Sequence, residues 1–287
     1  MAILPLFTQH SRSWRTNRYV YPVISRRSKG LSIGVNVNPD KICNFDCVYC
    51  SVDRTTPPTV RTVDLEVLRD ELDHLLEIAV SRELFAHPPF DQTPPHLRRI
   101  NDVAFSGDGE PTSFQRFNDA CEIAVDLIAR HRRPDVKIVV ITNATLFHQQ
   151  RVRDALAYLD HHSGEIWAKL DAGTEPYYRL IERTSIPLQR VLDNIRRAGQ
   201  QRPIVIQSLF LQLDDAGPSD EEIGQYVERL KELVTGGCQI KLVQVYTVAR
   251  GTAVATCTPL PATKLDAISE RVRRDTNLPV ETYHGPT

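Results

Sequence analysis

Strand-forming and helix-forming patterns alternate along this chain of 287 residues, and that alternation limits the folds it can adopt. Runs rich in β-branched residues recur between stretches whose apolar residues have helical spacing. One such stretch is 64–80, where a single helical face carries Leu65, Leu68, Leu72, Leu75 and Ala79. We expect strands in SIGVNV (32–37), NDVAFSG, VKIVVIT (136–142), EIWAKLD, PIVIQSLFL and QIKLVQVYTV, and LPVETYH could add a last one.

About six strand–helix units of this kind indicate a parallel sheet with helices packed outside it. A closed barrel would need eight units, so we predict an α/β fold with an open, partial (β/α)6 TIM-like barrel. A doubly wound Rossmann-type sheet is the alternative, because periodicity alone does not distinguish the two folds. We expect one barrel domain over residues 31–287, preceded by a basic arm over residues 1–30 and interrupted by a proline-rich insertion at about 85–98.

Three cysteines follow the first expected strand in the segment CNFDCVYC, at Cys43, Cys47 and Cys50. Clustered thiols of this kind suit a metal or redox site in a reducing compartment. A structural zinc site needs four protein ligands, whereas three thiolates on a four-iron cluster leave one iron open to a substrate or cofactor. The alternatives are zinc completed by a distant Cys238, Cys257 or histidine, and an electron carrier, which would normally close its cluster with a fourth cysteine.

Other polar stretches also follow expected strands. SGDGEPT follows the second strand, TNATL ends the third, KLDAG ends the fourth and ARGT follows the sixth. Because the carboxyl ends of parallel strands meet at one edge of a sheet, we expect one site there. Cys121, Cys238 and Cys257 are scattered, and we interpret them as small core residues.

These motifs carry a family resemblance. CNFDCVYC resembles the cluster motif of the radical S-adenosylmethionine (SAM) superfamily, and SGDGEPT (106–112) resembles its GGEP motif, with Asp108 where a glycine is common. The stretch from YVYPVISRR to KLDAGTEPYYRLI is similar to the branch of wyosine-type tRNA-modifying enzymes. The resemblance spans roughly residues 18 to 250.

The resemblance implies that Cys43, Cys47 and Cys50 hold a [4Fe–4S] cluster whose open iron binds SAM. Reductive cleavage of SAM would give methionine and a 5′-deoxyadenosyl radical, which abstracts hydrogen from a substrate. A flavodoxin or ferredoxin-type partner would supply the electron. A non-catalytic zinc-bound or degenerate barrel scaffold is an alternative, as is a radical SAM activase acting on a protein or a small molecule.

The resemblance also suggests SAM-binding residues. In the loop Gly107, Asp108, Gly109 and Glu110, glycines would let the backbone approach the methionine moiety, and Glu110 could accept from its ammonium. Tyr49 would place a ring beside the open iron, or pack under the loop. Side chains that could hold ribose hydroxyls and the methionine carboxylate, or instead cap helices and turns, are Thr142, Asn143, Lys169 and Asp171.

Two further expectations concern strand ends near the site. Gln207 and Ser208 are consecutive on the fifth expected strand, so only one of them can face the site. Arg250 could bind an anionic group, or lie on the surface.

Charge is uneven along the chain, although its net charge of −1 predicts no general attraction to nucleic acid or membranes. Before Asp40 there are only basic charged residues, namely Arg12, Arg15, Arg18, Arg26, Arg27 and Lys29. Trp14, Tyr19 and Tyr21 lie among them and could stack bases of a tRNA or contact another anionic substrate, unless the arm is simply solvated. Since no apolar run reaches about 18 residues, we expect a cytoplasmic protein that does not cross a membrane.

Overall fold

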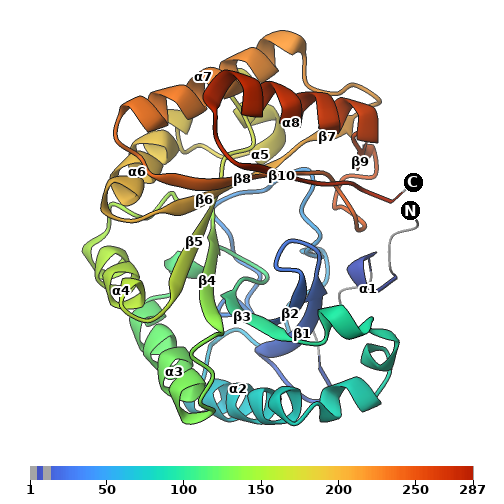
Figure 1. The fold of residues 1–287 in the computed structure, drawn as a ribbon, viewed down its shortest axis with the longest axis vertical. Coiled ribbons are helices and arrows are strands. Elements are labelled where there is room, and N and C mark those ends of the chain that lie inside the picture. Colours follow the sequence, from blue (N-terminus) through green and yellow to red (C-terminus); the bar gives the residue numbers. More distant parts are fainter. Residues whose placement is uncertain (1–4, 9–13, 287) are drawn as a thin grey trace.

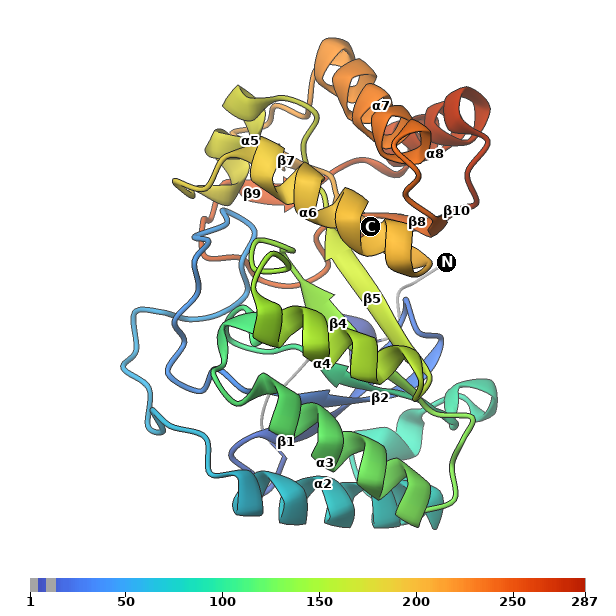
Figure 2. The same ribbon diagram turned by 90° about the vertical axis from the view of Figure 1, so that its left-hand side faces the viewer.

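The structure is a computed structural model that describes residues 5–8 and 14–286. A curled sheet forms its centre, and helices cover the outer face of the sheet (Figures 1 and 2). The eight strands of this sheet, in spatial order, are β1 (Val20–Ser25), β2 (Gly30–Val35), β3 (Ile100–Phe105), β4 (Lys137–Thr142), β5 (Gly164–Lys169), β6 (Ile204–Leu209), β8 (Ile240–Tyr246) and β10 (Val280–Tyr283).

The order of strands in space follows their order in the chain, and from β2 onward every neighbouring pair is parallel. A doubly wound sheet would reverse its order at a switch point, so the Rossmann alternative is excluded and the partial barrel is confirmed. The outer helices are α2 (Leu65–Val80), α3 (Phe117–Arg130), α4 (Gln150–Asp160), α5 (Glu175–Glu182), α6 (Leu188–Gln201), α7 (Asp220–Thr235) and α8 (Ala262–Thr276).

Burial of apolar helix faces holds the helices on the sheet. In α2 the five residues predicted to share one face are all buried. Asp64 caps this helix by accepting from the backbone N–H groups of Glu66 and Val67. The expected strand LPVETYH also forms, as β10, and pairs in parallel with β8.

Some elements were not predicted. Strand β1 is antiparallel to β2, and β7 (Leu211–Leu213) pairs with β9 (Cys257–Pro259) in a separate two-stranded sheet. Helix α5 has only eight residues and a proline in its first turn, too short for a helical period to stand out. The short α1 (Pro5–Thr8) precedes β1.

The proline-rich insertion forms three short 3-10 helices, η1 (Glu83–Ala86), η2 (Phe90–Gln92) and η3 (Pro95–Leu97). Its apolar residues turn inward, and Phe85, Phe90 and Leu97 are buried. A further 3-10 turn, η4 (Pro111–Ser113), lies beyond β3.

The interpretation of Trp14, Tyr19 and Tyr21 as base-stacking residues is wrong. Their side chains are only 8%, 2% and 4% exposed, because all three are part of the hydrophobic core. Glu71 of α2 draws this segment in by accepting from the backbone N–H groups of residues 18–20. Arg12 lies outside the described residues.

The carboxyl group of Asp102 on β3 offers a test of how tightly β2 and β3 are packed. It is 3% exposed and accepts from the Ser32 hydroxyl of β2, and burial raises its pKa to about 6. Between its unfolded pKa and pH 6 the folded protein therefore holds a proton that the unfolded chain has lost, so stability falls as pH rises through this range.

We expect Asp102→Asn to abolish this fall of stability with rising pH. Measured by urea unfolding, the variant should gain about 2–3 kcal/mol relative to the wild type between about pH 4 and about pH 7. The exposed Asp70→Asn is the control and should follow the wild type. Parallel pH profiles for Asp102→Asn and the wild type would show that Asp102 is not held in a low-dielectric environment.

Candidate functional site

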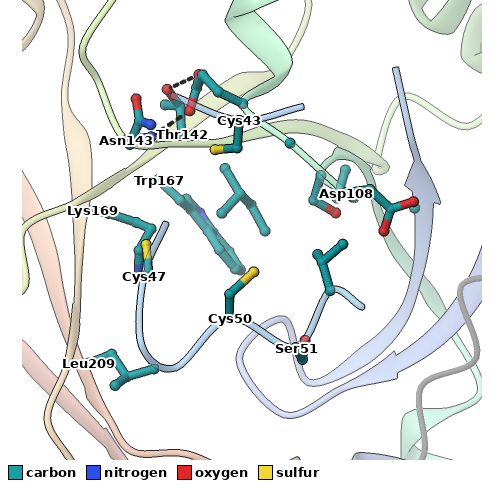
Figure 3. Close-up of a pocket in the computed structure, with 18 of the residues that line it drawn as sticks. Cys43, Cys47, Cys50, Ser51, Asp108, Thr142, Asn143, Trp167, Lys169 and Leu209 are labelled. Atoms are coloured by element: carbon teal, nitrogen blue, oxygen red, sulfur yellow. Dashed lines mark hydrogen bonds between the residues drawn. The ribbon is translucent and has the colours of Figure 1, made fainter. Parts of the chain in front are cut away.

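A cavity of about 280 Å³ lies where the carboxyl ends of the strands meet, on the inner side of the sheet (Figure 3). The residues named in the sequence analysis that line it are Tyr21, Arg27, Cys43, Cys47, Tyr49, Cys50, Gly107, Asp108, Gly109, Glu110, Thr142, Asn143, Lys169 and Arg250. Asp171 does not line the cavity but pairs with Lys169, which does. Parallel topology therefore gathers motifs from five distant parts of the chain.

The cysteine-bearing loop after β2 is anchored at several points. The backbone N–H groups of Asp46 and Val48 donate to the carbonyls of Glu182 and Ile181, at the end of α5, over 3.1 and 2.9 Å. The Cys50 carbonyl accepts from the backbone of Ala253 over 2.7 Å. Although the loop lacks regular secondary structure, these bonds give it a defined path.

The three cysteine side chains surround one space (Figure 3). Burial raises the pKa of the Cys43 thiol to about 11, and burial together with Glu182 raises the pKa of Cys47 further above its usual value. Metal binding needs thiolates, so a metal would have to displace these protons. In the described part of the chain, no three His, Cys, Asp or Glu side chains are already arranged as a metal site.

The other cysteines lie elsewhere. Cys121, Cys238 and Cys257 are at most 5% exposed, as predicted for core residues, and none of them lines the cavity. The fold therefore does not support a zinc site in which Cys238 or Cys257 is the fourth ligand.

The glycine loop packs directly on the cysteine loop. A Cβ atom on Gly107 would collide with the Asn36 side chain, and one on Gly109 would collide with the Ile42 carbonyl. Asn36 also donates to the Asp108 carboxylate over 2.7 Å and accepts from the Asp108 backbone over 3.2 Å. Glycine is thus needed here because two loops meet without room for a side chain.

Glu110 joins the ends of β3 and β4. Its buried carboxylate accepts from the backbone and hydroxyl of Thr112, the hydroxyl of Thr142 (2.6 Å) and the backbone of Asn143 (2.8 Å). Burial raises its pKa, although these hydrogen bonds favour the charged form. Since the carboxylate already has four donors within the chain, it braces the loop more than it reaches into the cavity.

A buried charged cluster lies beneath Tyr49. Asp171 forms an ion pair of 2.8 Å with Lys169, which offsets the effect of burial and keeps the pKa of Asp171 below its usual value. The Tyr49 hydroxyl lies within hydrogen-bonding distance of both Asp171 and Glu182. The Tyr49 hydroxyl has one proton, so it can donate to only one of these two carboxyl groups at a time.

Glu182 is the carboxyl group that takes up a proton more readily. Burial and the neighbouring Asp171 raise its pKa to about 8, and Cys47 Sγ lies 2.6 Å from its second oxygen. No sequence pattern indicated this role, because Glu182 is at the end of an unpredicted helix and 135 residues from Cys47.

Arg54 was also missed, although it follows Cys50 by four residues. Its guanidinium donates to Cys50 Sγ over 3.2 Å, to the Lys41 carbonyl over 3.1 Å and to the Asp108 carbonyl over 3.4 Å. It therefore connects the last cysteine to the glycine loop with a positive charge.

Gln207 and Ser208 do not line the cavity. Gln207 donates to Gln244 on β8 over 2.7 Å, and Ser208 donates to the Leu170 carbonyl over 2.6 Å. The inner face carries instead Trp167 and Tyr246, aromatic residues that were not predicted to be at the site.

The structure thus combines an α/β partial barrel with three cysteines and a glycine loop that line one cavity. The family model described as "Radical SAM superfamily" matches residues 37–212. The chain belongs to this superfamily. Membership implies SAM and an iron–sulfur cluster as cofactors, and enzymes of the class typically need an electron donor.

Curated relatives include UPF0026 protein MJ1312 of Methanocaldococcus jannaschii, 27% identical over 76% of this chain and 61% of that protein. A UPF0026 protein of Helicobacter pylori is 23% identical over 73% of this chain and 61% of its own length. The chain thus spans less than two thirds of these relatives.

Solved structures share the fold. A radical SAM methyltransferase from Sphaerobacter thermophilus matches 92% of this chain and 69% of its own, with a TM-score of 0.62 and 12% identity. TYW1 with a lysine-pyruvate adduct bound matches 86% of this chain and 74% of its own, with a TM-score of 0.52 and 14% identity. Among the residues described, no helix has the length and apolar character needed to cross a bilayer.

The Glu110 brace predicts a specific loss of stability. In Glu110→Gln the side-chain NH₂ group would replace one carboxylate oxygen. It would then face an N–H or O–H donor of the chain, and that hydrogen bond would be lost. We expect the free energy of unfolding, measured in urea, to fall by about 1–3 kcal/mol. Glu77→Gln is the matched control, because Glu77 is exposed on α2; equal stability of the two variants would contradict the brace.

Proposed function

We propose that this protein cleaves SAM reductively, using a [4Fe–4S] cluster bound by Cys43, Cys47 and Cys50. The cluster, when bound, supplies the electron that breaks the sulfonium C–S bond to give methionine and a 5′-deoxyadenosyl radical, which abstracts hydrogen from a substrate. The observation that carries the proposal is that three thiols and a glycine loop line one cavity.

The donor set fits this cofactor. Three soft sulfur ligands face the same cavity, and none of the other three cysteines lines it. Three thiolates suit a cluster with one iron left open, whereas structural zinc would require a fourth protein ligand. Arg54 would favour the thiolate of Cys50, since it already donates to this sulfur atom.

SAM would be held by the residues of the glycine loop and its neighbours. Backbone groups of Gly107–Glu110 lie against the cysteine loop, and Glu110 would keep them in position. Thr142 Oγ1 donates to Glu110, and the Asn143 side chain donates to Asn44 and accepts from Thr145. Both residues would therefore hold the loops around SAM in position. Lys169 would offer a positive charge at the cavity wall, with Asp171 positioning it from behind.

A flavodoxin or ferredoxin-type protein would donate the electron. For the substrate, burial of Trp14, Tyr19 and Tyr21 weakens the case for base stacking by the basic segment. An anionic substrate, such as a nucleotide, remains our proposal because Arg27 and Arg250 line the cavity.

Anaerobic reconstitution with iron and sulfide, followed by dithionite and SAM, tests the proposal. We expect a brown protein that forms 5′-deoxyadenosine, and at least a hundredfold loss of this product in Cys43→Ala, because one cluster ligand is removed. Cys121→Ala is the matched control, since its buried thiol is remote from the cavity and product formation should persist.

Two results would overturn the proposal. One is a protein that binds zinc tightly and takes up no cluster, which would favour the scaffold. The other is a reconstituted cluster that never cleaves SAM.

A further inference from the structure

A second, smaller cavity of about 80 Å³ adjoins the first. The two share several lining residues, among them Arg27, Tyr49, Tyr246 and Arg250. The turn after β1 forms one wall of the smaller cavity, and the segment after β8 forms the opposite wall. A molecule could therefore extend from one cavity into the other.

The lining of the smaller cavity is strongly positive. Its described residues include Arg26, Arg27 and Arg250 and no aspartate or glutamate. Hydroxyl groups of Ser25 and Thr247 add hydrogen-bonding capacity. Two adjacent guanidinium groups, Arg26 and Arg27, in a lining without aspartate or glutamate are typical of a site for an anion.

The chain itself does little to neutralise two of these charges. Among the described residues, neither Arg26 nor Arg27 forms an ion pair with a carboxylate. Arg26 donates to the His284 carbonyl, and the Arg27 guanidinium lies 4.6 Å from the ring centre of Tyr246 and 5.9 Å from that of Trp167. Burial, with Arg27 as a second cause, lowers the pKa of Arg26 to about 10.

Bringing adjacent like charges into a partly buried site is unfavourable unless an anion binds there. Each guanidinium offers up to five N–H donors, and Arg26 directs a hydrogen bond to one backbone oxygen. A phosphate dianion, with three free oxygens, matches two adjacent guanidinium groups better than a singly charged carboxylate.

We infer that the smaller cavity binds a phosphate group of the substrate through Arg26 and Arg27, leaving the rest of the substrate in the larger cavity. This assignment of a substrate class rests on the proposed function for the larger cavity. Stacking on Tyr246 orients the Arg27 fork, so Arg27 is the residue whose loss should weaken binding most.

The test is isothermal titration of the purified full chain with inorganic phosphate, and separately with ribose 5-phosphate, acetate and unfractionated tRNA. We expect both phosphates to bind and acetate to bind more weakly. Arg27→Gln should weaken phosphate binding by roughly tenfold or more, as loss of a hydrogen bond to a charged group implies. Arg26→Gln should act in the same direction, as a second variant if Arg27→Gln fails to fold by circular dichroism.

The exposed Arg61→Gln is the matched control, because Arg61 lines neither cavity and should leave binding unchanged. Equal binding of phosphate by the wild type and both site variants would overturn the inference. Tighter binding of acetate than of phosphate would overturn the phosphate assignment, and binding of tRNA alone would show that the arginines contact an RNA backbone instead.

These titrations need neither cluster nor SAM, so they separate the two proposals. Phosphate binding without SAM cleavage would leave the anion site standing and remove the proposed reaction. SAM cleavage without phosphate binding would support the proposed reaction and overturn the anion site.

Discussion

The hydrogen bonds accepted by the buried Glu110 carboxylate hold the site together. They connect the loop after β3 to the end of β4, and the same loop packs through Gly107 and Gly109 on the cysteine loop after β2. Three consecutive strand ends are thereby fixed relative to one another. Exchanging any partner would leave a buried acceptor or donor without its match, which is unfavourable at low dielectric.

A second buried network, beyond the end of the neighbouring strand β5, also supports the cysteine loop. Tyr49 and Cys47 both contact Glu182, and Asp171 joins this group to Lys169. Together with Arg54, which bonds Cys50, these residues surround the thiols with specific polar partners. The cysteine loop has no regular secondary structure, yet these polar contacts hold it in one position.

Side-chain contacts also join the two edges of the sheet, β1 and β10, beside the smaller cavity. Lys29 in the turn after β1 pairs with Glu281 of β10 over 2.7 Å, and the Tyr283 hydroxyl donates to the Arg27 carbonyl over 3.3 Å. These contacts bring the turn with Arg26 and Arg27 beside the segment after β8. The basic residues that suggested a nucleic-acid-binding arm therefore contribute in part to the wall of a cavity.

The sequence by itself determined a parallel α/β sheet with outer helices and the edge of the sheet that carries the polar motifs, because periodicity and strand-end position are local properties. It also identified the cysteine and glycine loops, whose spacing is visible in the chain. The tertiary structure decided the strand order, which distinguishes the partial barrel from a doubly wound sheet. Only the tertiary structure decided that Trp14, Tyr19 and Tyr21 are buried, and that Glu182 and Arg27 join the site. Those outcomes depend on contacts between residues far apart in sequence, which no local pattern encodes.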